Sequence, residues 1–197
     1  ATMNELLTKG IGHTEFKDSR VGRIPKGWDV FKLGELGCDG KNAIVDGPFG
    51  SSINTARDYI NNGIPVIRTV NIRPFLFLED NLKYISHDTF ERVKRSAVYP
   101  NDVLLSKVGT IGYSCIFPNH LQKAMLSTTG SCKITANQDR ITPLYLCYSL
   151  NFLKPYMDLI SSEGVQPFLN MSTIKSFLIK VPSLKEQNEI IEILESI

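Results

Sequence analysis

Short runs of Val, Ile, Phe and Tyr alternate with Gly, Asn, Asp and Pro from residue 28 to residue 134. This alternation constrains the fold most, because it is typical of short strands separated by tight turns. The clearest strands are predicted over residues 65–70, 103–108 and 115–117. Helical patterns are fewer. The sequence therefore predicts an α+β fold with a curved, β-rich body and short helices.

Helical spacing is found in three stretches around these strands. Residues 3–9 predict the end of a helix, and Gly10 is suited to terminate it. Residues 89–96 predict a short helix with apolar residues three apart and basic residues on the other side. Residues 143–160 predict a longer helix, which Pro155 kinks or divides.

The last fourteen residues predict an amphipathic helix that follows a strand over residues 177–181. Ser183 with Glu186 three residues later is the pattern of a capping box. Ile190, Leu194 and Ile197 have the spacing of a coiled-coil seam, which predicts an interface with a partner helix. An ordinary helix that docks on its own domain is the alternative, and the sequence leaves both open.

Composition limits the classes of protein to consider. The chain has 197 residues, 42% of them hydrophobic, which is enough for one well-buried core. Its four cysteines form no closely spaced pair and its three histidines are isolated, so we expect reduced thiols, a cytoplasmic location, and no metal, cofactor or catalytic site. No apolar run is long enough to span a membrane. A net charge of +2 is compatible with nucleic acid but does not demand it.

Several short motifs follow one another in an order that resembles a known family. They are Gly-Arg-Ile-Pro-Lys-Gly-Trp at residues 22–28, Gly-Pro-Phe-Gly-Ser at 47–51, Gly-Ile-Pro-Val-Ile-Arg at 63–68, Asp-Val-Leu-Leu-Ser at 102–106 with Gly-Thr-Ile-Gly at 109–112, and Val-Pro-Ser-Leu at 181–184 with Glu-Gln at 186–187. Together they resemble the DNA-specificity subunit of type I restriction-modification systems. The chain is similar to one target recognition domain, whereas a complete subunit of that family carries two.

The resemblance implies a domain organisation and a function. Residues 1–22 would be the tail of a conserved helix and a connector, residues 23–182 the target recognition domain, and residues 183–197 the start of the conserved dimerisation or spacer helix. Such a domain has no active site of its own. It would read one half of a bipartite double-stranded DNA target, while partner methyltransferase subunits, and through them the restriction subunit, do the chemistry. A homodimer through the terminal helices is a further expectation.

Candidate DNA contacts follow from residue type and position. Arg suits guanine, Asn or Gln suits adenine, and Lys or small polar residues in glycine-rich turns suit phosphates. The main candidates are Ser51, Ser52, Arg57, Arg68, Asn71, Lys107 and Thr110, and further candidates are Lys41, Ser127, Thr128, Thr129, Gln166 and Asn170. Each has a structural alternative: an ion pair for the arginine at 68, local turn bonds for the serines and threonines, and simple solvation for the lysines.

Two other functions are compatible with parts of the sequence. The chain could be an orphan protein-interaction module that binds methyltransferase or specificity subunits without significant DNA binding of its own. It could also be an adenine methyltransferase, because residues 46–49 partly match a motif of those enzymes. No glycine-rich cofactor loop accompanies that motif, so we expect no binding of S-adenosylmethionine.

Overall fold

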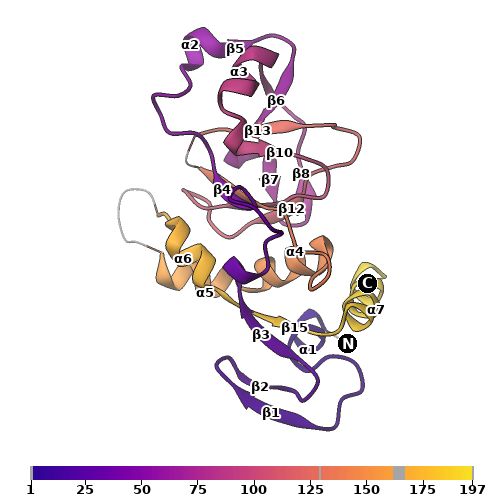
Figure 1. The fold of residues 1–197 in the computed structure, drawn as a ribbon. Coiled ribbons are helices and arrows are strands. Elements are labelled where there is room, and N and C mark those ends of the chain that lie inside the picture. Colours follow the sequence, from indigo (N-terminus) through magenta and orange to yellow (C-terminus); the bar gives the residue numbers. More distant parts are fainter. Residues whose placement is uncertain (1, 129, 162–166, 197) are drawn as a thin grey trace.

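The computed structural model describes residues 2–128, 130–161 and 167–196. Figure 1 shows an elongated molecule in which sheets and short helices form the upper half, and helices with small antiparallel pairs form the lower half. Both ends of the described chain lie in the lower half, near α7. The predicted α+β fold with a β-rich body and short helices is confirmed.

The upper sheet has five strands in the order β10-β13-β6-β9-β5, formed by Ala97–Val98, Ala124–Leu126, Ile64–Ile67, Lys83–Ile85 and Tyr59–Ile60. Only β13 and β6 run parallel to each other. Their carboxyl ends therefore lie at the same edge of the sheet, and the segments that follow the two strands are brought together.

The second sheet has four antiparallel strands in the order β12-β11-β14-β4, formed by Ser114–Ile116, Val103–Ser106, Ser131–Ile134 and Ile44–Asp46. Every residue of β11 and β14 is buried, because both faces of the sheet are covered. Leu104 packs into the core between the two sheets, whereas Val103 and Leu105 pack on the helical side. This is the period of two expected of a strand.

Three hydrophobic cores separate the layers. The top core lies between the five-stranded sheet and α3 (His87–Arg92), where Val66 and Met125 meet Phe90. The middle core lies between the two sheets and includes Ile67 and Leu126. The third and largest fills the lower half. Adjacent residues of one strand thus point to different cores, which fixes the register of the upper sheet.

The lower half combines helices with two antiparallel strand pairs. The helices are α1 (Met3–Lys9), α4 (Pro143–Phe152), α5 (Lys154–Ile160), α6 (Met171–Ser176) and α7 (Leu184–Glu195). The pairs are β1–β2 (Phe16–Ser19 with Gly22–Pro25) and β3–β15 (Asp29–Lys32 with Leu178–Val181). The remaining elements are η1 (Leu33–Glu35), α2 (Thr55–Asp58), η2 (Thr69–Asn71), β7 (Ile72–Arg73), β8 (Leu76–Phe77) and η3 (Lys94–Ser96).

Several sequence-based boundaries differ from the structure. The predicted helix over residues 143–160 is divided into α4 and α5, with Pro155 in the first turn of α5, as expected. The strand predicted to reach residue 70 ends at Ile67, because residues 69–71 form a 3-10 turn. The helix predicted over 89–96 starts earlier, after its cap Ser86, and ends at Arg92. The predicted connector before residue 23 contains β1, which pairs across that boundary with β2.

The final helix docks on its own domain. Ser183 caps α7, accepting a hydrogen bond from the Glu186 backbone N–H, as expected. The other half of the predicted capping box is absent, because the Glu186 carboxylate instead bonds residues near the start of the chain. The adjacent Gln187 is fully buried and bonds the backbone of Arg140 and Thr142 just before α4.

The predicted coiled-coil seam is wrong for Ile190. This side chain is fully buried in the chain's own lower core, and Leu194 is half-buried against the same core. Ile197 lies outside the described residues. Because α7 also packs against α1 and α4, its apolar face is already used within the chain.

Candidate nucleic-acid interface

An open groove lies where the segments after β6, β11 and β13 meet. We call it the Arg68 groove, and it is lined by Tyr59, Arg68, Thr69, Val70, Val108, Gly109, Thr110, Ser127, Thr128 and Gly130. The parallel pairing of β6 with β13 brings two of these segments to one edge, and the Ser127 N–H bonds the Ile67 carbonyl there. The lining carries one positive charge, no carboxylate and several hydroxyl groups.

Arg68 separates the groove from a second cavity lined by Arg68, Val70, Arg73, Leu78, Asp80, Asn81 and Lys83. Its guanidinium donates to the Asn81 carbonyl at 2.6 Å, but its Nε is buried with no hydrogen-bond partner in the described part of the chain. Among the described residues, the arginines that form ion pairs with carboxylates are Arg57, Arg92 and Arg95, and Arg68 is not one of them. The structural alternative of an internal ion pair for Arg68 is therefore wrong, and its guanidinium keeps unused donors beside the groove.

Asn71 does not belong to this exposed surface. It is fully buried, its Oδ1 accepts from the Arg68 N–H at 3.0 Å, and its Nδ2 donates to the Leu78 carbonyl at 2.9 Å. These bonds hold the 3-10 turn that follows β6. A base could reach this amide only if the turn opened, so the structure corrects the prediction that Asn71 reads DNA.

The loop over residues 47–52 abuts the groove. A Cβ on Gly47 would lie 1.6 Å from the Ser127 carbonyl oxygen, so only glycine fits this close approach. The Ser52 N–H bonds the Phe49 carbonyl at 2.8 Å and closes a turn. Ser51 is exposed and Ser52 half-buried, and neither hydroxyl bonds the described protein, so both remain available to a partner.

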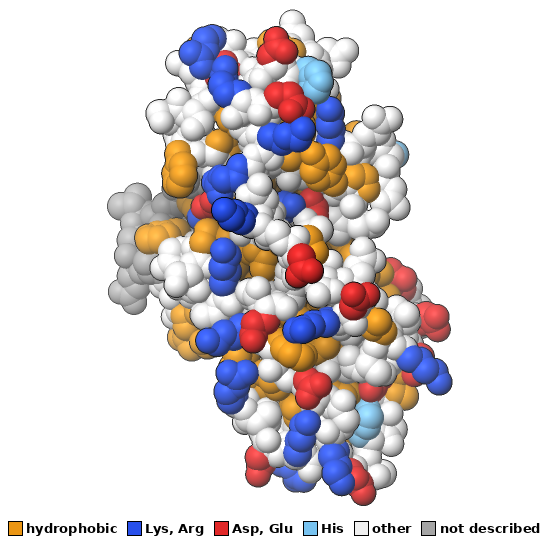
Figure 2. All heavy atoms as spheres, in the orientation of Figure 1, with side chains coloured by type: hydrophobic (Ala, Val, Ile, Leu, Met, Phe, Trp, Pro, Cys, Tyr) orange, Lys and Arg blue, Asp and Glu red, His pale blue; other side chains and the backbone are white. Residues whose placement is uncertain are grey.

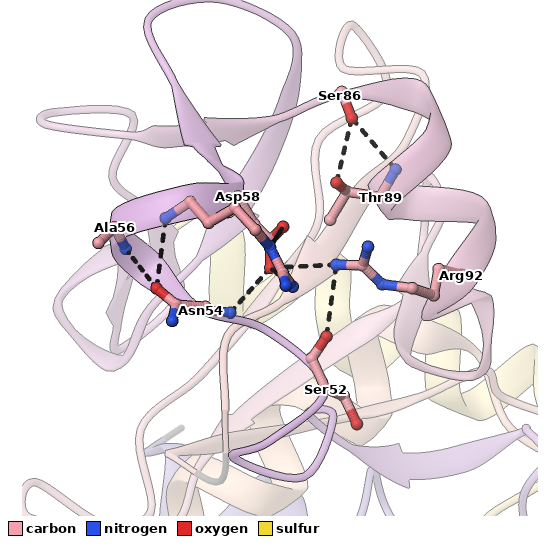
Figure 3. Close-up of polar contacts among 8 residues, drawn as sticks. Ser52, Asn54, Ala56, Asp58, Ser86, Thr89 and Arg92 are labelled. Atoms are coloured by element: carbon pink, nitrogen blue, oxygen red, sulfur yellow. Dashed lines mark hydrogen bonds and ion pairs between the residues drawn. The ribbon is translucent and has the colours of Figure 1, made fainter.

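Arginines lie around this loop, and a buried carboxylate on α2 pairs with two of them. Asp58, whose side chain is 5% exposed, bonds Arg57 Nε at 2.9 Å. It also bonds Arg92 at 3.0 Å (Figure 3). The Arg57 guanidinium, the Asn54 backbone N–H and Arg92 hold the pKa of the Asp58 carboxyl well below its usual range. The carboxylate thus stays ionised and orients two guanidinium groups that remain exposed.

A second carboxylate, Asp46, orients Arg95. Their ion pair spans 3.2 Å, and the Arg95 guanidinium also lies 5.4 Å from the centre of the Phe49 ring. Lys107 contacts the other Asp46 oxygen at 3.6 Å and is only 6% exposed. Its ammonium is therefore used inside the fold, which corrects the prediction that Lys107 contacts phosphate.

We define the arginine arc as Arg57, Arg92 and Arg95. Figure 2 shows Lys and Arg side chains over both the upper and the lower half of the face drawn, with Asp and Glu side chains among them. Arg57 was predicted as a contact, whereas sequence reasoning placed the other two only on the polar side of a helix. Their role is set by carboxylates far away in sequence, at Asp58 and Asp46.

The other candidates divide between the groove, other surfaces and undescribed positions. Thr110 and Thr128 are exposed in the Arg68 groove, where Ser127 is half-buried. Lys41 is exposed in the turn before β4. Asn170 caps α6 by accepting from the Thr173 N–H at 2.8 Å, so its oxygen has a structural use. Thr129 and Gln166 lie outside the described residues.

The cysteines and the other possible metal ligands are dispersed in the described structure. All four cysteines are free thiols, and burial raises the pKa of the Cys132 and Cys147 thiols to about 12. Within residues 2–128, 130–161 and 167–196, no three His, Cys, Asp or Glu side chains gather as a metal site would require. In the same ranges, no helix is both long enough and apolar enough to cross a membrane.

Comparisons with known proteins point to one family. The chain is 29% identical over 198 residues to the type I restriction enzyme MjaIX specificity subunit of Methanocaldococcus jannaschii, covering 95% of this chain and 42% of that protein. It is 28% identical over 142 residues to the EcoBI specificity subunit of Escherichia coli, covering 71% of this chain and 30% of that protein. The chain thus spans less than half the length of these relatives.

A solved structure shares the fold. The HsdS subunit from Thermoanaerobacter tengcongensis superposes with a TM-score of 0.62 at 20% identity, covering 92% of this chain and 39% of that one. The family model of the type I restriction modification DNA specificity domain matches residues 25–197, nearly the whole chain. The chain therefore belongs to the type I restriction modification DNA specificity domain family.

Proposed function

We propose that this chain recognises one half of a bipartite double-stranded DNA target, as part of the specificity subunit of a type I restriction-modification complex. The Arg68 groove is the observation that carries the proposal. Hydroxyl groups can donate to or accept from base edges, an arginine suits guanine, and the exposed Val70 suits a thymine methyl group. Such a lining supports base reading better than a catalytic role.

The arginine arc supplies the second requirement of a DNA reader. Exposed guanidinium groups contact phosphates, and their orientation by Asp58 and Asp46 reduces the conformational freedom that binding would otherwise cost. The proposed phosphate contacts are Arg57, Arg92 and Arg95, together with the hydroxyls of Ser51 and Ser52. The proposed base contacts are Arg68, Thr110, Ser127 and Thr128. Asn71 and Lys107 are not proposed as DNA contacts, because both side chains are buried.

The proposed partners follow from the family. The chain would act without catalysis of its own, and methyltransferase subunits, with a restriction subunit bound through them, would carry out the chemistry. We do not propose a homodimer through the predicted Ile190 seam, because the Ile190 side chain is fully buried in its own domain. The methyltransferase would contact a surface other than the Arg68 groove.

Selection from a library of randomised duplexes tests the DNA proposal with the chain alone. We expect enrichment of one short sequence, and an affinity that falls with salt at a log-log slope of about −0.9 per phosphate contacted. Arg68→Ala should broaden the selected sequence at one position. Arg140→Ala, which removes an exposed arginine outside the groove, is the matched control. No enrichment, with association to methyltransferase subunits that hardly responds to salt, would instead support the interaction-only module.

A further inference from the structure

Phe49 is the most exposed aromatic side chain in the described part of the chain. This residue is 68% exposed and belongs to the loop over residues 47–52. Single exposed apolar residues are common on protein surfaces and need no explanation by themselves. The surroundings of this ring, rather than its exposure alone, indicate a function.

The backbone of the loop that carries Phe49 is constrained at three points. Gly47 is pressed against the Ser127 carbonyl, Pro48 is buried, and the bond from the Ser52 N–H to the Phe49 carbonyl closes the turn. Because Ser127 lines the Arg68 groove, the base of the loop that carries the ring adjoins that groove. A rigid support of this kind allows an apolar side chain to act without first being ordered.

Arginines also lie at the ring and at the loop that carries it, each paired with Asp58 or Asp46. Arg95 lies over the ring at 5.4 Å, and Arg92 donates to the Ser52 carbonyl at 3.5 Å, with the exposed Arg57 on the same carboxylate as Arg92. An apolar protein surface that covered Phe49 would have to desolvate these guanidinium groups, which is costly. A nucleic acid instead offers a π face for the ring and phosphates for the arginines.

We propose that Phe49 is a wedge that stacks on an unstacked base step at the edge of the half-site, while the arginine arc holds the flanking phosphates. The inference rests on the proposed DNA recognition and adds to it a deformation of the duplex. Base pairs that are weakly stacked would be preferred at the wedge position, because less stacking energy is lost there.

A binding measurement with damaged duplexes tests the wedge. The probe is a fluorescein-labelled duplex of about two helical turns that carries the half-site enriched by selection, either fully paired or with an abasic site at the edge of that half-site. The intact chain should bind the abasic duplex at least about fivefold more tightly, because the unstacking cost is already removed. Phe49→Ala should lose that preference while its salt slope stays unchanged, and Phe49→Trp should retain it.

The control is Leu159→Ala on α5, which removes an apolar side chain that is 82% exposed in the lower half of the molecule. It should behave like the intact chain. Equal affinity of the intact chain for paired and abasic duplexes would overturn the wedge and leave DNA recognition standing. Binding to neither duplex would overturn both. Thermal unfolding of each variant checks that the exposed substitutions leave the fold intact.

Discussion

Two carboxylates in opposite halves of the molecule have contrasting partners. Glu186, in the first turn of α7, accepts from the Trp28 indole at 2.9 Å, from the His13 ring at 2.7 Å and from the Ile11 N–H at 3.2 Å. Asp58, on α2 in the upper half, bonds Arg57 and Arg92 instead. Both carboxylates are nearly buried, with side-chain exposures of 14% and 5%.

The contrast lies in where the donors point. The partners of Glu186 include a fully buried indole, and a Cβ on Gly10 would lie 2.4 Å from its Oε1, so this carboxylate joins distant segments inside the lower half. The arginines of Asp58 remain exposed at their outer surfaces. The same kind of hydrogen bond thus stabilises the fold in one region and presents charge to a partner in the other.

Glu186→Ala should show the largest effect on stability. It leaves the buried Trp28 indole N–H without an acceptor and detaches α7 from residues 11–13, at a cost of about 3 kcal/mol in the free energy of unfolding. Urea denaturation measures this loss. Glu189→Ala, an exposed change on the same helix, is the control. A loss as small as that of the control would remove the distinction between the two carboxylates.

Lys107→Ala should reduce stability by about 2 to 3 kcal/mol, because it leaves the largely buried Asp46 paired with Arg95 alone. The salt slope of DNA binding should not change, since this ammonium does not reach phosphate. Thermal unfolding and a salt titration measure the two effects. A changed slope without lost stability would return Lys107 to the list of DNA contacts.

Asn71→Ala should cost about 1 to 2 kcal/mol of stability, since three bonds that hold the turn after β6 are lost. Any fall in DNA affinity should be similar for all sequences. Binding to duplexes that differ at single positions of the selected half-site is the relevant measurement. Relaxed preference at one base pair only, with stability intact, would mean that the buried amide reads DNA after all.

Arg92→Ala should weaken DNA binding by about 1 kcal/mol and reduce the salt slope by about 1, as expected for one lost phosphate contact. Arg140→Ala, which removes an exposed arginine in the lower half, should change neither. Fluorescence anisotropy over a range of salt concentrations gives both quantities. An equal effect of the two changes would show that only net charge matters.

Asp58→Asn tests the electrostatic side of the comparison through pH. The pKa of the Asp58 carboxyl is lowered in the folded chain, so its contribution to stability is present above about pH 4 and is lost as the pH falls below that. The variant should lose less stability on acidification than the intact chain. Glu91→Gln removes an exposed carboxylate whose pKa Lys94 lowers, and it should have a smaller effect. Denaturation midpoints across acid pH measure this.

The motif residues Glu186 and Gln187 illustrate what the pattern could and could not predict. Ser183 followed by Glu186 correctly marked the start of α7, because caps depend on neighbouring residues only. The carboxylate's actual partners lie more than 150 residues away, at separations of 158 to 175 positions. Spacing within a helix contains no information about such distant donors, so the second half of the capping box was predicted wrongly.

The candidate site shows the same limit. Turn residues and strand ends predicted Arg68, Thr110 and the serines of the 47–52 loop as DNA contacts, and the structure leaves these residues at least partly exposed. Burial separated them from Asn71 and Lys107, which look equally polar in the sequence. Arg92 and Arg95 joined the arc only because Asp58 and Asp46 meet them in space.

By itself, the sequence determined the fold class, the clearest strands, the division of the helix at Pro155 and the membership of a family, because periodicity, turn residues and short motifs are local properties. The tertiary structure decided which polar side chains form bonds inside the fold and which face outward. Only parallel pairing of β6 with β13 forms the Arg68 groove, and only packing in its own core removes Ile190 from a partner seam. Burial and long-range pairing depend on the whole chain, and no local pattern contains them.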